Sequence, residues 1–174
     1  MTSQLLTAAV LTTFALLAQT ATAASSTPSS SRDSNLVERG KYLVKISGCN
    51  DCHTPGYMPA DGQVPLRLWL TGSAVGFQGA WGTTYPSNLR LTMNAMNEAE
   101  WLVRARQPMR PPMPWFNLQD MTDRDLLAIY RFVRSLGPAG EPTPVAVAPG
   151  ERVDTPYFEF MPKNLPAPAQ QARR

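Results

Sequence analysis

The segment Cys49–His53, with the sequence CNDCH, constrains this chain more than any other feature. It holds both cysteines and the single histidine of the 174 residues. Two thiols separated by two residues and followed at once by a histidine form the C-x-x-C-H pattern of covalent haem c attachment. In that chemistry the thiols add to the two vinyl groups of haem, and the imidazole binds the iron. The motif therefore predicts one haem held covalently by Cys49 and Cys52, with His53 as an iron ligand.

Three other chemistries use cysteines at this spacing, and each needs a context that this sequence does not supply. A thioredoxin-like redox pair belongs to a βαβ unit, whereas a predicted helix ending at Gly48 precedes Cys49. A zinc site takes four ligands, and the chain has no further cysteine or histidine. A structural disulfide, common in exported proteins, leaves His53 unexplained. The haem interpretation is favoured over all three.

The first residues of the chain have the pattern of an export signal. Leu5–Ala18 is an apolar run interrupted only by threonines, and it is shorter than the roughly 20 apolar residues that span a bilayer. Small residues follow at Ala21-Thr22-Ala23, a typical cleavage pattern. Residues 1–23 are therefore predicted to be a signal peptide, which places the mature chain in the periplasm without stable membrane insertion. An uncleaved anchor is the alternative, since no Lys or Arg precedes the run.

Apolar residues at helical spacing predict helices in the remainder of the chain. The helices are expected over residues 35–47, 94–106 and 122–136. Asp33 or Ser34 is the expected N-cap of the first helix, which ends at Gly48. Thr122 is the expected N-cap of the last helix, and Gly137 ends it.

Composition divides the chain into a leader, one domain and an extension. Residues 24–34 are Ser-rich and polar, which predicts a flexible leader. The domain is expected to occupy residues 35–138. Within it, residues 54–92 contain recurrent Gly and Pro and no lasting period, so a long loop is expected there, wrapped around a group that is not protein. Residues 139–174 form a Pro-rich extension, and its aromatic patch at 157–160 leaves two options open, disorder or attachment to the domain surface.

A second axial ligand for the iron is sought among the methionines, because a thioether sulfur is a soft ligand that favours reduced iron. Met113 lies between Pro112 and Pro114, which favour a stiff, extended backbone with no N–H groups to offer to a helix. The segment is therefore suited to presenting a sulfur atom, and Trp115 beside it is expected to exclude water. Met109 is the second candidate.

These segments together resemble the class I c-type cytochromes. The matching parts are Glu38–Leu43 (ERGKYL), CNDCH, the PPMPW segment at 111–115 and the amphipathic helix at 122–136. The resemblance implies a small all-α fold in which the first and last helices cross, with long loops around the haem and the Pro-rich tail added. It implies that Gly40 allows close approach to the face bearing Ile129 and Tyr130. By the same resemblance, the residues that line the haem are Trp81, Tyr85, Asn88, Arg90 and Trp115.

The function that the resemblance implies is that of a single-electron carrier, not an enzyme. Its partners would be redox proteins, with a donor such as a dehydrogenase and an acceptor such as an oxidase or another cytochrome. A cytochrome subunit tied to one periplasmic dehydrogenase is a second interpretation. A haem-based sensor or peroxidase is a third, and it is disfavoured because His53 is the only histidine and no distal histidine is available.

The charges of the chain restrict its partners. The formal net charge of +3 is too small to indicate nucleic-acid binding. Arg104, Arg106 and Arg110 lie just before the predicted ligand segment, which in the cytochromes that this chain resembles lies near the exposed haem edge. They are predicted to form a basic rim that attracts an acidic redox partner. Ordinary solvated helix charges are the alternative.

Overall fold

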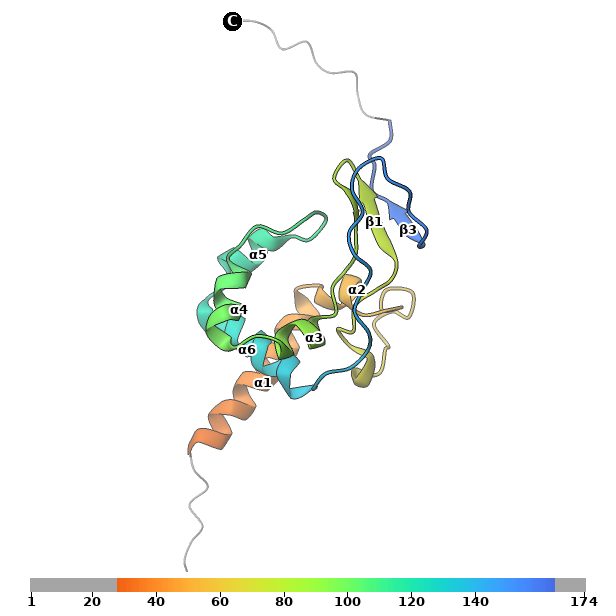
Figure 1. Ribbon diagram of the computed structural model, residues 1–174. Helices are drawn as coiled ribbons and strands as arrows, with labels where there is room; N and C mark the ends of the chain where they lie inside the picture. The colour runs from red at the N-terminus through yellow and green to blue at the C-terminus, as the bar shows by residue number, and fades with distance from the viewer. Residues whose placement is uncertain (1–27, 165–174) are drawn as a thin grey trace, which may run out of the picture.

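The structure of the chain is a computed structural model that describes residues 28–164 (Figure 1). The predicted signal peptide, residues 1–23, lies outside the described residues. The elements in chain order are α1 (Pro28–Ile46), α2 (Cys49–His53), η1 (Leu66–Leu68), β1 (Gly76–Gly79), β2 (Gly82–Thr84), α3 (Leu89–Asn94), α4 (Glu98–Ala105), α5 (Trp115–Asp120), α6 (Asp123–Ser135) and β3 (Tyr157–Glu159). Within residues 28–164, no helix has both the length and the apolar character needed to cross a bilayer.

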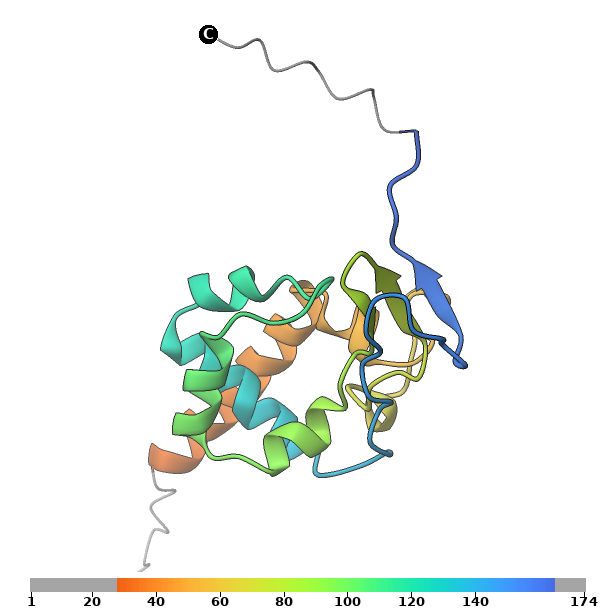
Figure 2. The same cartoon turned by 45° about the horizontal axis from the view of Figure 1, so that its top comes forward.

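The packing of α1 against α6 builds the helical side of the molecule, and the sheet lies on the other side (Figures 1 and 2). The apolar positions of α6 recur at helical spacing and are buried, as the sequence predicts. Thr122 is the N-cap of α6, where its side chain accepts a hydrogen bond from the backbone N–H of Asp125. The buried residues of α6 are Leu126, Ala128, Ile129, Tyr130, Phe132 and Val133.

α1 extends further toward the N-terminus than predicted. The expected start lies at residue 35, after a cap at Asp33 or Ser34, whereas α1 spans Pro28–Ile46. Residues 28–34 of the predicted flexible leader are therefore helical. Their polar sequence carries no apolar period, so periodicity does not detect them. Once the buried part of α1 is helical, further residues are added without a new nucleation cost.

Gly40 allows the two long helices to approach closely, but the partner residues differ from those predicted. A Cβ at Gly40 would overlap the carbonyl oxygen of Ala128 and the Cβ of Phe132. The residues nearest to Gly40 are therefore Ala128 and Phe132, which lie one helical turn apart on α6, and not the predicted Ile129 and Tyr130. Tyr130 points elsewhere, and its hydroxyl donates to the carbonyl of Met96 at 2.8 Å.

Substituting Gly40→Ala is expected to destabilise the fold by about 1–3 kcal/mol or more, because the added methyl group must push α1 and α6 apart. Glycine in an exposed helix interior shows the opposite trend, since alanine there gains about 1 kcal/mol of helix propensity. The measurement is urea unfolding of the holoprotein, with Lys45→Ala on the exposed face of α1 as the control. A Gly40→Ala variant as stable as the wild type would contradict the close packing.

The helix predicted over residues 94–106 corresponds to α4, which begins later, at Glu98, and ends at Ala105. α3 lies mostly within residues 54–92, where a loop was predicted. Asn97 interrupts the helical path because it is the N-cap of α4, in a capping box whose other member is Glu100. α5 was not predicted, and it starts directly after the last proline of the 107–114 segment.

The expectation of an all-α fold is corrected by a small three-stranded sheet in the order β2-β1-β3. β1 pairs antiparallel with β2 and parallel with β3, with Phe77 opposite Phe158. The hairpin falls inside residues 54–92, which were predicted to be a loop. Strands of three or four residues that contain glycine show too little alternation to be recognised by periodicity.

The C-terminal extension is attached to the domain in its described part, up to residue 164. The rings of Phe77 and Phe158 lie 5.6 Å apart between centroids, and those of Trp81 and Phe160 lie 5.9 Å apart. Thr83 and Val147 exchange two backbone hydrogen bonds of 2.9 Å. The aromatic patch at 157–160 is therefore attached to the domain surface, which was one of the two options that the sequence left open. Residues 165–174 lie outside the described residues.

Candidate haem and iron-ligand site

The CNDCH motif forms a short helix directly after the end of α1. Gly48 joins α1 to α2 with a left-handed backbone (φ 68°), a conformation that glycine adopts at little cost. Cys49 and Cys52 are three residues apart on α2, a spacing that brings two side chains onto the same face of a helix. The two cysteines are not joined to each other by a disulfide. The motif thus places two cysteine side chains on one turn, followed at once by His53.

The electrostatics of the two thiols argue against a redox dithiol. Burial raises the pKa of the Cys49 thiol to about 11. Burial and, secondarily, the Asp51 carboxylate raise the pKa of the Cys52 thiol. Redox-active C-x-x-C motifs instead lower a thiol pKa to stabilise the thiolate. Among the described residues there is also no cluster of metal-ligating side chains of the kind a zinc site needs.

His53 is buried, and its ring is held by one hydrogen bond. Its Nδ1 lies 2.7 Å from the carbonyl oxygen of Ser87. A carbonyl oxygen only accepts, so Nδ1 must carry the proton and donate it. In the neutral imidazole this leaves the lone pair on Nε2, the nitrogen that can bind a metal. Burial lowers the pKa of His53 against the opposing effect of the Ser87 bond, so the neutral form is favoured.

A buried polar network continues from the motif into the next loop. The Thr54 hydroxyl donates to the Asn50 side-chain oxygen at 2.7 Å and accepts from the backbone N–H of Leu70 at 2.8 Å. Leu70 is fully buried and has φ 62°, an unfavourable backbone conformation for a leucine. The backbone N–H of Gly72 donates to the His53 carbonyl at 2.8 Å. These bonds hold the residues on both sides of His53 in place.

Met113 lies in the segment between α4 and α5. Its side chain is partly buried against the core, and so is that of Met109, which stays the second candidate. The Thr84 hydroxyl at the end of β2 donates to the carbonyl of Pro111 at 2.6 Å. In both views this segment extends from the helical side toward the hairpin (Figures 1 and 2). The hairpin therefore anchors the tip of the predicted ligand segment.

Of the residues predicted to line the haem, Trp81 lies in the turn of the hairpin, Tyr85, Asn88 and Arg90 lie between the hairpin and the middle of α3, and Trp115 begins α5. Asn88 is the N-cap of α3 and donates to the carbonyls of Ala139 and Glu141 at 2.8 and 3.2 Å. The Tyr85 hydroxyl lies 2.6 Å from the Thr155 hydroxyl. Asn88 and Tyr85 thus bind the extension, a role that the resemblance does not imply.

Arg90 carries a buried charge that is held by carbonyl oxygens. Its guanidinium donates to Gly137 at 2.6 Å, to Arg67 at 2.7 Å and to Leu136. Burial lowers the pKa of this guanidinium. Trp115 begins α5, and its backbone N–H donates to the Met113 carbonyl at 2.8 Å, so it lies beside the predicted ligand.

The hydrogen-bond donors and potential iron ligands among the side chains are of the types that would bind a haem group. The buried polar atoms that lack a hydrogen-bond partner among the described residues are Asn50 Nδ2, Trp81 Nε1 and Thr83 Oγ1. A buried donor left unpaired costs about 1–3 kcal/mol, and the Trp81 N–H is suited to a carboxylate such as a haem propionate. The chain therefore offers two thiols, an imidazole with a lone pair on Nε2, a thioether and an unpaired indole donor.

Ser87, Thr84 and Thr54 were missed by sequence reasoning. Ser87 and Thr84 each act through one hydrogen bond to a residue that is distant along the chain. Thr54 acts through two, to the Asn50 side chain and to the buried backbone N–H of Leu70. Serine and threonine in a Gly- and Pro-rich stretch are ordinary loop residues, and no signal in the sequence distinguishes these three.

The crossed helices and the haem-binding donor set define a helical haem protein with a covalent attachment motif. Residues 37–137 match the family model described as cytochrome c, which is more than half of the chain. The chain belongs to the cytochrome c family, and the resemblance to class I c-type cytochromes is confirmed. The family binds haem c covalently and transfers electrons to and from redox proteins. No curated protein and no solved structure matches the chain.

Proposed function

We propose that the chain is a periplasmic single-electron carrier with one haem c, bound through Cys49 and Cys52 and ligated by His53 and Met113. The observation that carries the proposal is the hydrogen bond from His53 Nδ1 to Ser87, which leaves Nε2 free to bind iron. Bound haem supplies a one-electron couple between ferric and ferrous iron. The protein contributes the ligands and a buried environment, which together set the potential of that couple.

The side chains divide this work between them. The two thiols fix the position of the group, and Ser87 fixes the orientation of the imidazole ring. Burial lowers the pKa of His53, which favours the neutral imidazole that can bind iron. Met113 would supply the second protein ligand to the iron, and Trp115 would exclude water beside it. With two ligands supplied by the protein, the proposal assigns electron transfer and no enzymatic activity to the chain.

The proposed location rests on the export pattern at residues 1–23 and on the domain that follows it. One measurement tests the location, the number of haems and the covalent bond together. The protein is purified from the periplasmic fraction of its host, and its intact mass is determined under denaturing conditions. We expect residues 24–174 plus one haem. A mass that includes residues 1–23, a mass without haem, or a mass with two haems would each contradict the corresponding part of the proposal.

Attachment to one dehydrogenase is a second candidate function, favoured by the extension. Tyr157, Phe158, Phe160 and Met161 are exposed apolar side chains on a segment that lies outside the matched residues. Exposed apolar patches of this kind often bind proteins. Native purification decides between the two functions. A stoichiometric oxidoreductase that co-elutes with the chain supports the subunit, whereas elution of the chain alone supports the diffusing carrier.

A further inference from the structure

We propose that Arg106 and Gln119 are positioning residues for the sixth iron ligand, because they close the two ends of the segment that carries Met113. The inference rests on the proposed role of Met113 as that ligand. We call the pair the Arg106–Gln119 clamp.

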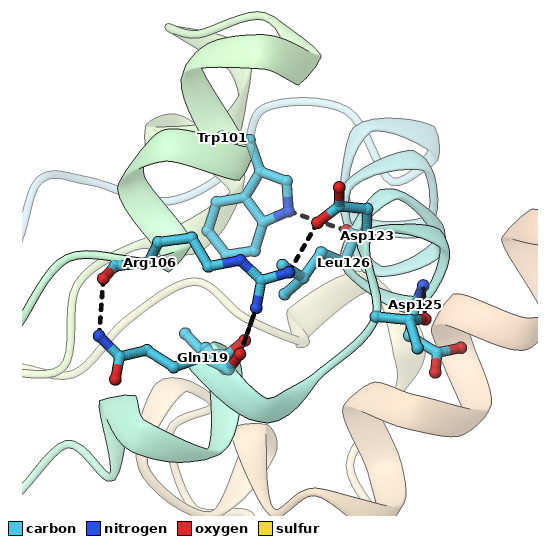
Figure 3. A network of polar contacts seen from close by, with 8 residues as sticks. Trp101, Arg106, Gln119, Asp123, Asp125 and Leu126 are labelled. Atoms are coloured by element: carbon cyan, nitrogen blue, oxygen red, sulfur yellow. Dashed lines mark hydrogen bonds and ion pairs between the residues drawn. The ribbon is translucent and has the colours of Figure 1, made fainter.

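The clamp consists of side chain-to-backbone hydrogen bonds that run in both directions (Figure 3). The Arg106 guanidinium donates to the carbonyls of Leu118, at 3.1 Å, and of Gln119. In return the Gln119 side-chain amide donates to the Arg106 carbonyl at 2.7 Å. Arg106 also pairs with the Asp123 carboxylate at 2.6 Å. The end of α4, the end of α5 and the start of α6 therefore meet at one guanidinium.

Among the described residues, the segment between the two clamp residues forms few other hydrogen bonds to distant parts of the chain. Four prolines in residues 107–114 offer no N–H groups. The hydrogen bond from Thr84 to the Pro111 carbonyl holds the middle of this segment. The clamp holds its two ends together, which reduces the conformational freedom of the residues that present Met113. Loss of the clamp should therefore raise the fraction of molecules in which Met113 has left the iron.

The geometry of Arg106 corrects the predicted basic rim. Its guanidinium is engaged by two carbonyls and a carboxylate, so it is not a free charge for a partner. Asp123 is 69% exposed and Arg106 34%, so the ion pair alone contributes little. The bonds to the carbonyls are the larger contribution, because Leu118 is buried. Arg104 and Arg110 are both exposed and stay in the predicted rim.

The test measures how readily an external ligand replaces Met113 in the ferric holoprotein. Imidazole binds only where Met113 has dissociated, so its apparent affinity reports the open fraction. We expect Arg106→Gln to raise that affinity about tenfold, the effect of losing one charge-assisted hydrogen bond at a partly exposed site. The matched control is Arg104→Gln, which makes the same charge change two residues away and should leave the affinity unchanged.

A second background separates positioning from a general loss of stability. In Met113→Ala the axial position is already open, so adding Arg106→Gln should produce no further rise in imidazole affinity. If Arg106→Gln gives no holoprotein, Gln119→Ala removes only the return bond and is tested in the same way, with a smaller rise expected.

Two outcomes would overturn the inference. In the first, Arg106→Gln binds imidazole no more tightly than the control Arg104→Gln does; where Arg106→Gln gives no holoprotein, the same comparison is made with Gln119→Ala. In the second, adding the clamp substitution to Met113→Ala raises the imidazole affinity as much as it does in the wild-type background. Failure of the proposed function looks different, because Met113→Ala itself would then retain the far-red absorption band of a methionine–ferric iron bond.

Discussion

Replacing Cys52 with alanine is expected to remove nearly all mature holoprotein. The variant loses one of the two thioethers, and residues 54–92, which were expected to wrap the haem, lose the group around which they pack. Unpaired buried donors such as Trp81 Nε1 then stay without a partner. The measurement is the yield of covalent haem in the periplasmic fraction, read from haem absorbance that survives acid-acetone extraction. We expect the yield to fall by on the order of tenfold or more, since small domains are only marginally stable.

Asp51→Ala is the matched control for this variant. Asp51 is exposed and lies between the two cysteines on the same turn, so its substitution tests whether any change in α2 has the same effect. We expect a holoprotein yield close to that of the wild type. Haem that acid acetone extracts from the wild-type protein, or a full covalent yield from Cys52→Ala, would show that the attachment through Cys52 is wrong.

The second large effect is expected for Met113→Ala. Removal of the thioether should leave the ferric iron open or ligated by water, so imidazole or cyanide should bind on the order of a hundredfold more tightly, without having to displace a protein ligand. The far-red band should disappear from the oxidised spectrum. Met113→His should keep six-coordinate, low-spin haem with a lower potential, since methionine ligation raises it.

Met109→Ala is the comparison that decides the assignment of the sixth ligand. Met109 and Met113 are both partly buried in the same segment, so the two substitutions remove similar volumes from similar positions. If Met109→Ala loses the far-red band and Met113→Ala keeps it, Met109 is the ligand. If both variants keep the band, the sixth ligand lies outside this segment.

The parts of the fold that were predictable are those whose cause is local in the sequence. The apolar stripe of α6 and its Thr122 cap need only neighbouring residues, and both were predicted. The start of α4 was placed too early, at residue 94, because the helix was assigned from the spacing of its apolar residues alone. The capping box formed by Asn97 and Glu100, which marks the true start, was not taken into account. The chemistry of the motif was predictable because the chain has only two cysteines and one histidine, which leaves no competing ligands.

The parts that were not predictable depend on contacts between distant segments. β3 forms by pairing with β1, where Phe158 lies opposite Phe77. Each strand is too short to show the alternation of apolar and polar residues that would identify it in the sequence. The imidazole of His53 is oriented by the backbone carbonyl of Ser87. Because every residue has a backbone carbonyl, the sequence cannot identify Ser87 as the hydrogen-bond partner. The hydrogen bonds of Arg106 were not predicted for a similar reason, since the sequence does not show which of Arg104, Arg106 and Arg110 has acceptors beside it.

The parallel pairing of β3 with β1 has a consequence for the order in which the molecule is completed. The pairing joins Phe77 to Phe158, two residues that are far apart in the chain, so β1 gains its second partner strand only when the C-terminal extension folds back onto it. Closing a contact over so many residues is slow compared with forming helices. The CNDCH motif precedes both strands in the chain, so α2 needs neither of them in order to form.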